Sequence, residues 1–254
     1  MAQENFGASQ ITLVASALTL AGQAGWTQRD WELANQKEFW ERMKLVNDGK
    51  AEIMPLTPVK PARGPSPQQQ IISFYAQVFG LCEEARQALK ELKRTENLRL
   101  QVQTLILGDD VLTLEAALDK IDAFWPNEAA PYTWSDVSSI KIPKEHERPK
   151  GAYILHHTGE EGSDKIHKGK SYNDALGVMN FMTPKEYVIF WAYTLWTKKI
   201  YLDASGWTRL CATWPDGSIV CGSSDSRQLN LGHGHPADRH SDSGPREVSF
   251  ALVT

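Results

Sequence analysis

Apolar residues recur every three or four positions through much of the first two thirds of the chain. Residues 10–50 show this spacing, and from Gln68 to about Leu107 it predicts one long helix with a nearly continuous apolar seam. The seam consists of Ile71, Phe74, Val78, Leu81, Ala85, Leu89 and Leu92. Because such a seam must be covered, we expect the N-terminal helices to pair with each other or to join copies of the chain into a homo-oligomer.

Two further helices carry recognisable start signals. Thr113 precedes a run with helical spacing that reaches Phe124. Later, Thr183-Pro184-Lys185-Glu186 places a Thr as N-cap, a Pro in the first turn and a Glu that can bond back to the cap. We therefore expect a helix rich in aromatic residues from Thr183 to about Ile200.

The pattern changes after residue 150. Short apolar runs alternate with turn residues, and Pro215-Asp216-Gly217 is the clearest turn. We expect strands at residues 152–155, 207–210, 219–221, 228–231 and 248–253. Helices followed by short strands indicate a chain of the α+β class.

Two segments divide the sequence. Five prolines fall within residues 55–67, which favours an extended linker. The charged run from Lys144 to Lys150 has the composition of a domain boundary. We therefore expect a helical region over residues 1–145, with the linker inside it, and a second domain over residues 146–254.

Composition argues against several classes of protein. A formal net charge of −4 disfavours a binder of nucleic acid, whose phosphates call for a basic face. No uninterrupted apolar run reaches the length of a membrane span, and no Lys or Arg precedes the apolar stretch 11–24 as a secretory signal would require. We therefore expect a protein without a secretory signal, for which a cytoplasmic location is favoured and the compartment stays open. Cys211 and Cys221 are expected as two buried thiols, or as one bridge if they face each other on neighbouring strands.

The segment 211–246 lacks several common residues. It contains no Lys, Glu or Met, but six Ser, five Gly, four Asp and three His. Codons that end in a pyrimidine cannot encode Lys, Glu, Gln, Met or Trp. These five types supply 56 of residues 1–199, a rate that predicts about ten in the segment, whereas two occur. Asn codons randomised at their adenines would give the observed vocabulary of Ser, Gly, Asp, His, Asn, Ala, Arg, Thr, Cys and Pro, although loops rich in Gly and Ser would show part of the same bias.

This part of the chain resembles the variable proteins of diversity-generating retroelements, which carry adenine-mutagenised positions on a C-type-lectin-type fold. The shared layout is an aromatic helix (183–200), a strand that opens with Gly206-Trp207-Thr208, a variable segment of short strands and a closing strand. Asn230, Pro236-Ala237-Asp238-Arg239 and Gly244-Pro245-Arg246 are similar to the Trp-Asn-Pro, Arg and Gly-Phe-Arg ending of that family.

The chain also departs from the family pattern. No Trp stands beside Asn230, Pro245 replaces the Phe, and eight residues follow Arg246. The resemblance covers about residues 150–254. It implies a C-type-lectin-like domain of short strands with flanking helices, a fold related to that of formylglycine-generating enzymes.

The resemblance implies a ligand-binding protein with a hypervariable surface, and not an enzyme. The ligand would be a protein or a glycan, bound without a cofactor, since the Glu-Pro-Asn and Gln-Pro-Asp loops of calcium-dependent lectins are absent. The expected ligand-binding residues are Ser223, Ser224, Ser226, Asn230, His233, His235, Asp238 and His240.

Two other functions stay open. His233, His235 and His240 have the character of metal ligands, and a metal-assisted hydrolase would use them. Their Gly-rich backbone favours a solvated loop instead, and His is a common product of a randomised Asn codon. A structural or viral attachment subunit is the third possibility.

Overall fold

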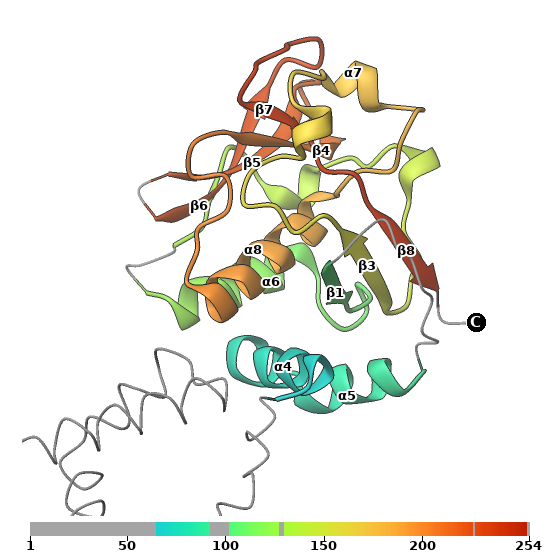
Figure 1. Ribbon diagram of the computed structural model, residues 1–254, viewed down its shortest axis with the longest axis vertical. Helices are drawn as coiled ribbons and strands as arrows, with labels where there is room; N and C mark the ends of the chain where they lie inside the picture. Colours follow the sequence, from blue (N-terminus) through green and yellow to red (C-terminus); the bar gives the residue numbers. More distant parts are fainter. Residues whose placement is uncertain (1–64, 92–101, 127–129, 226, 253–254) are drawn as a thin grey trace, which may run out of the picture. The chain divides into compact units, whose positions relative to one another are not determined.

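The computed structural model describes residues 65–91, 102–126, 130–225 and 227–252 (Figure 1). The chain divides into two compact units, Met1–Arg63 and Gly64–Thr254, and all described residues belong to the second. The helices expected over residues 10–50 and most of the proline-rich segment 55–67 therefore lie outside the described residues. The second unit runs across residue 145, where the sequence places a domain boundary.

The first described helices lie between residues 67 and 91. Helix α4 (Pro67–Phe74) begins at a capping box and continues as a π-helix, η1 (Tyr75–Phe79). Gly80 follows η1 with a left-handed φ of 73°, and α5 (Cys82–Glu91) comes next. The apolar seam is therefore divided between two helices at a residue whose backbone conformation favours glycine.

The single helix expected from Gln68 to Leu107 is wrong in its second half. Val102–Ile106 forms strand β1, which pairs antiparallel with β3 (Tyr153–His157). Thr104, Leu105 and Ile106 are all buried. Three consecutive buried residues fit a strand covered on both sides better than one stripe of a helix, and pairing with a distant segment decides the conformation.

Helices α6 (Leu114–Phe124) and α8 (Pro184–Lys198) form where their start signals predict them. Thr113 and Thr183 are the N-caps, and Glu186 completes the capping box of α8. α8 is buried over nearly its whole circumference, so it is the central helix of the unit. A single turn of helix, α7, and short 3₁₀ turns occupy the connections, at Tyr172–Ala175, Val137–Ser139, Lys144–His146 and Lys165–His167.

The described strands form two sheets, and α8 contacts both (Figure 1). The smaller sheet is antiparallel with the order β1-β3-β8, where β8 is Ser249–Leu252. The larger sheet has the order β2-β6-β5-β4-β7. Its strands are β2 (Tyr132–Thr133), β4 (Trp207–Thr213), β5 (Ile219–Asp225), β6 (Gln228–Gly234) and β7 (Ser243–Pro245). β4, β5 and β6 form an antiparallel meander, whereas the edge strands β2 and β7 pair in parallel with β6 and β4.

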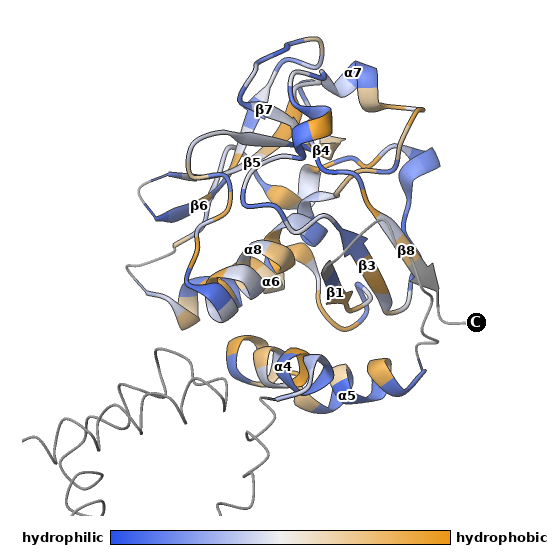
Figure 2. Ribbon diagram, in the orientation of Figure 1, coloured by the Kyte–Doolittle hydropathy of each residue, from blue (hydrophilic) through white to orange (hydrophobic). Residues whose placement is uncertain are grey.

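The α+β class expected from the sequence is confirmed, and each of the five apolar runs forms a strand. The segment 211–246 is more regular and more buried than a surface of loops, because it supplies most of the meander. In Figure 2, apolar residues are prominent on α4 and α8 and in the segment that follows α7, while the loop that leads to β7 is mostly polar. Within the described ranges, no helix has the length and apolar character that crossing a membrane requires.

A buried ion pair ties the residue after β7 to the segment that precedes β4. Arg246 Nη2 donates to both carboxylate oxygens of Asp203, at 3.1 and 3.2 Å, and both side chains are 1% exposed. The same carboxylate accepts hydrogen bonds from Tyr187 Oη at 3.0 Å and Thr208 Oγ1 at 2.8 Å. Because these partners satisfy both charges, the pair can be buried beside α8.

Candidate functional site

The larger sheet has one face against α8 and one face away from it. Successive residues of a strand alternate between the two faces. On β5, Gly222 and Ser224 face α8: a Cβ at Gly222 would collide with the Tyr187 ring, and the Ser224 hydroxyl accepts a hydrogen bond from Trp191 Nε1 at 2.7 Å. The residues of β5 that alternate with these two belong to the opposite face.

We call that opposite side the outer face. Antiparallel pairing sets Ser223 opposite Asn230 and Cys221 opposite Gly232, so the outer face continues from β5 onto β6. On these two strands it consists of Ile219, Cys221, Ser223, Asp225, Gln228, Asn230, Gly232 and Gly234. Most of these side chains are small, which leaves room above the sheet.

Trp207 occupies that room. It is the first residue of β4, its side chain is 41% exposed, and its indole lies on Gly232: a Cβ at Gly232 would come within 2.9 Å of Trp207 Cζ3. The missing side chain of Gly232 therefore lets the indole rest on the sheet while part of the ring stays in solvent.

Two adjoining hollows share Trp207 and Asp242. The first, which we call the Trp207 groove, has a volume of about 510 Å³ and is also lined by Tyr132, Asp203, Ala204, Ser205, Gly206, Ser223, Ser224, Asp225, Gln228, Asn230 and Gly232. The second, which we call the histidine hollow, has about 270 Å³ and is also lined by Arg209, Cys221, His233, Gly234, Asp238, His240 and Ser243. Both are wide enough for one or a few side chains of a ligand.

An edge of exposed aromatic residues borders the sheet at β2. Tyr132 and Trp134, which are two positions apart in the chain, are 48% and 47% exposed. Tyr132 pairs with Asn230 in the parallel β2–β6 register, and the Trp134 amide donates to the Leu231 carbonyl at 2.8 Å. Trp134 also stacks on His233, with 3.7 Å between the ring centroids. Exposed aromatic rings beside polar groups are typical of binding surfaces.

The loop between β6 and β7 is anchored to α7. Arg239 forms a two-pronged ion pair with Asp174, with Nε to Oδ2 at 2.9 Å and Nη2 to Oδ1 at 2.6 Å. This bonding to Arg239, together with hydrogen bonds from Ser171, holds the pKa of Asp174 well below its usual range. The Asn173 amide adds a bond to the Pro236 carbonyl at 3.1 Å. The loop between β6 and β7, which carries His235, Asp238 and His240, is thus held at two points.

The structure divides the expected ligand-binding residues among several places. Ser223 and Asn230 line the Trp207 groove, and His233, Asp238 and His240 line the histidine hollow. His235 is exposed on the loop, and Ser226 lies outside the described residues.

The expected surface position of Ser223 and Ser224 is wrong, since their side chains are only 3% and 7% exposed. Both lie on β5, which is the middle strand of the meander and is covered by β4 and β6 on its two sides. The Ser224 hydroxyl is used within the core, where it bonds to Trp191 and to the Leu202 carbonyl. The Ser223 hydroxyl is buried and has no hydrogen-bond partner among the described residues.

The three histidines proposed as metal ligands do not converge. His233 stacks on Trp134, whereas His235 Nδ1 and His240 Nε2 each lie 3.9 Å from an oxygen of Asp238. Across the described ranges, no three or more His, Cys, Asp and Glu side chains are grouped so that they could hold a metal ion.

The aromatic part of the site does not follow from the unusual composition of the segment 211–246. Trp207, Tyr132 and Trp134 all lie outside that segment. Alternation along 207–213 was a usable signal for Trp207, because it sets Trp207 on the face opposite Thr208. Nothing in the sequence indicated that residues 132–133 would pair with β6, since that contact joins segments far apart in the chain.

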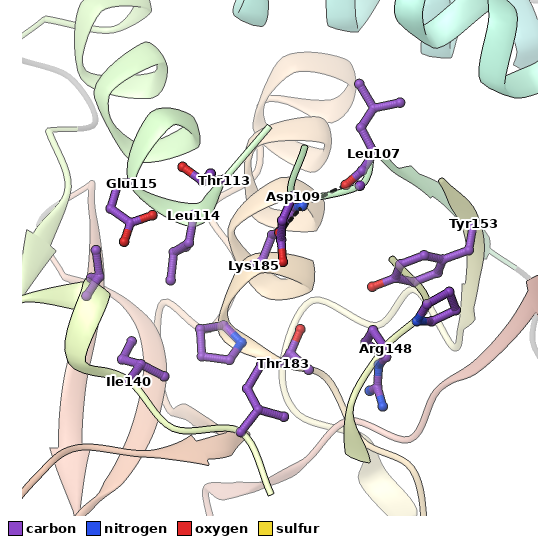
Figure 3. Close-up of a pocket in the computed structure, with 15 residues that line it drawn as sticks. Leu107, Asp109, Thr113, Leu114, Glu115, Ile140, Arg148, Tyr153, Thr183 and Lys185 are labelled. Atoms are coloured by element: carbon purple, nitrogen blue, oxygen red, sulfur yellow. Dashed lines mark hydrogen bonds and ion pairs between the residues drawn. The ribbon is translucent and has the colours of Figure 1, made fainter. Parts of the chain in front are cut away.

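A separate pocket of about 290 Å³ lies at the start of α8 (Figure 3). Its Lys185, Arg148 and Tyr153 side chains already have partners within the protein. Lys185 Nζ donates to Asp109 Oδ1 and to the Leu107 carbonyl, both at 2.6 Å. Arg148 and Tyr153 both bond to the buried Glu186 at 2.7 and 2.8 Å. We therefore assign this pocket to the packing of the helix start and place the candidate site at the outer face.

Cys211 and Cys221 are free thiols with buried side chains. Burial raises the pKa of each thiol to about 12, so both stay protonated near neutral pH. Of the two arrangements that the sequence left open, the structure has two buried thiols and no bridge. Neither thiol has the ionised form that a nucleophile or a metal ligand needs.

Comparisons of the chain with protein-family models, curated proteins and solved structures find no match.

Proposed function

We propose that this protein binds a ligand through the outer face of its larger sheet and that a retroelement diversifies the residues of that face on a lectin-like scaffold. The observation that carries the proposal is the alternation along β5 and β6. Six of the eight outer-face positions hold residues of the adenine-randomised vocabulary, namely Cys221, Ser223, Asp225, Asn230, Gly232 and Gly234, whereas Ile219 and Gln228 do not. Between them, Val220, Leu229 and Leu231 keep apolar side chains in the core.

The packing explains why such an arrangement would tolerate variation. Residues that face α8 are fixed by close contacts, of which the Gly222–Tyr187 approach and the Ser224–Trp191 hydrogen bond are the clearest. On the outer face, Ile219 and Cys221 pack in a second, smaller apolar cluster, whereas Asp225 and Gln228 are not buried. Short polar side chains beside exposed aromatic rings also resemble the composition of antibody combining sites, where polar groups adapt and aromatic rings anchor.

The chemistry of the outer face favours binding over catalysis. The cysteines are protonated, the Ser223 hydroxyl has no base as a partner within the described structure, and the histidines are separated. A shallow face with exposed aromatic rings and several carboxylates supplies contact area and hydrogen bonds, which is what recognition of a ligand requires.

Sequencing of the gene across a population tests the proposal. We expect substitutions at codons 223, 225 and 230 and constancy at codons 220, 229 and 231, because the first three line the Trp207 groove and the others face the core. A nearby template repeat that differs from codons 211–246 only at adenines, next to a reverse transcriptase gene, is expected as the source. A segment that is the same in every isolate, with no template, would overturn the proposal.

A further inference from the structure

The Trp207 groove has the charge of a site for a cation. Three carboxylates line it, those of Asp203, Asp225 and Asp242, and none of its lining residues is Lys, Arg or His. Asp203 is compensated by its buried pair with Arg246. Asp242 is exposed and takes part in no ion pair within the described part of the chain. The groove therefore presents negative charge to solvent.

The groove also presents aromatic surface beside that charge. The indole of Trp207 lies on Gly232 and leaves 41% of the side chain exposed, and Tyr132 is 48% exposed. A cation near the face of an aromatic ring is attracted by the ring quadrupole, most strongly over Trp. Carboxylates and aromatic rings in one groove therefore favour the same kind of ligand.

The floor of the groove supplies an unused hydrogen-bonding group. Ser223 is 3% exposed, lines the groove, and its hydroxyl has no partner within the described structure. A buried polar group without a partner costs free energy, which a bound donor would recover. Asn230 and Gln228 add amide oxygens beside it. The groove is thus rich in acceptors for a ligand with several donors.

Building on the proposed binding function, we propose that the Trp207 groove binds an arginine side chain of a protein partner. A guanidinium is planar, stacks on an aromatic ring and carries five donors in a fork that matches carboxylates, whereas the lysine ammonium is a strongly hydrated point charge. Trp207 and Tyr132 lie outside the segment 211–246, so the aromatic platform would be common to all variants. Asp225 and Asp242 lie inside it and set the charge in this variant.

The test compares two blocked tripeptides, Gly-Arg-Gly and its citrulline counterpart, by titration of the full chain followed by NMR or calorimetry. Citrulline has the shape of arginine without its charge. We expect the arginine peptide to bind with a Kd of about 1 mM or tighter at low salt and the citrulline peptide at least about tenfold more weakly. Raising the salt concentration is expected to weaken binding, because Asp225 and Asp242 are exposed.

Two variants with the same charge change locate the binding. Asp242→Asn removes a carboxylate of the groove and is expected to weaken binding of the arginine peptide several-fold. Asp122→Asn removes an exposed carboxylate on α6, away from the groove, and is expected to leave the Kd unchanged. Tyr132→Ala removes an exposed ring and is expected to weaken binding of the peptide without unfolding the protein.

The inference is overturned if the arginine peptide does not bind at about 10 mM, if the citrulline peptide binds as tightly, or if Asp122→Asn weakens binding as much as Asp242→Asn. These outcomes are distinct from failure of the proposed function, which sequencing of the gene decides. A varying gene with no arginine binding would reject only the inference. Arginine binding with an invariant gene would reject only the diversification.

Discussion

Two glycines of the larger sheet show how different its two faces are. A Cβ at Gly222 would collide with the ring of Tyr187, which is fully buried and hydrogen-bonded to Asp203. A Cβ at Gly232 would meet the indole of Trp207, which is partly in solvent and can move outward. Gly222 therefore contacts a core residue, and Gly232 contacts a surface residue.

We expect Gly222→Ala to lower the free energy of unfolding by about 3 kcal/mol, at the upper end of the cost of overpacking a core. Gly232→Ala should cost less than about 1 kcal/mol because only a surface ring moves, and it should increase the exposure of Trp207. Urea denaturation measures the free energies, and quenching of Trp fluorescence measures the exposure. Equal costs at the two positions would contradict the assignment of the faces.

The neighbouring serines provide a second comparison at the residue scale. Ser224→Ala removes the acceptor of the Trp191 indole and leaves a buried donor unsatisfied, so we expect a loss of about 1–3 kcal/mol. Ser223→Ala removes a buried hydroxyl that has no partner in the described structure, so it should not lower the free energy of unfolding and is expected to raise it by up to about 1 kcal/mol. Urea denaturation of the two variants tests this, and a larger loss for Ser223→Ala would contradict the described hydrogen bonding.

At the scale of elements, the pair of Arg246 and Asp203 joins the residue after β7 to the segment before β4. Arg246→Met leaves the Asp203 carboxylate buried without its cation, and we expect the free energy of unfolding to fall by about 3–5 kcal/mol. Adding Asp203→Asn should restore part of this loss, because the uncompensated charge is then removed. Urea denaturation measures each variant, and the double variant remains informative if the single one does not fold.

The pair of Arg239 and Asp174 is the matched control for that prediction. It also joins an Arg to both oxygens of an Asp, but it lies at the surface, where solvent and salt screen the charges. Arg239→Met is therefore expected to change global stability far less than Arg246→Met, while speeding hydrogen exchange in the loop between β6 and β7. A global loss as large as that of Arg246→Met would show that the anchored loop supports the whole sheet.

The elements also show what the sequence could predict. The starts of α6 and α8 were predictable because capping by Thr113, Thr183 and Glu186 is chemistry between neighbours in the chain. Strand β1 was not, because its conformation depends on pairing with β3. The same holds for the candidate site. The composition of the segment 211–246 indicates Ser223, Asn230 and His233, whereas Tyr132 is placed beside them only by the pairing of β2 with β6.

At the scale of the whole molecule, α8 packs against both sheets, and the candidate site lies on the face of the larger sheet that points away from α8. The smaller sheet contributes buried histidines to the core side, on β3. His157 is 1% exposed, packs against Phe190 and bonds to Thr104 Oγ1 at 3.1 Å. A residue that must stay neutral in the core connects the stability of the whole unit to pH.

We expect the protein to lose stability below about pH 6.5, where a histidine is protonated in the unfolded chain. Burial, helped by the charges of Arg246, His156 and Lys198, lowers the pKa of His157 to about 3 in the folded protein. Between these two values the unfolded chain binds the proton and the folded protein does not. The free energy of unfolding should therefore fall by about 1.4 kcal/mol for each pH unit of acidification.

Urea denaturation at pH 7 and pH 5 of the wild type and two variants measures this contribution. His157 should account for about 2 kcal/mol of the difference between the two pH values, so His157→Gln is expected to reduce that difference by this amount, whatever its own cost at pH 7. His240→Gln, at an exposed position, should leave the difference unchanged. If the wild type and His157→Gln lose equal stability on acidification, the neutral buried histidine is not the group that ties folding to pH.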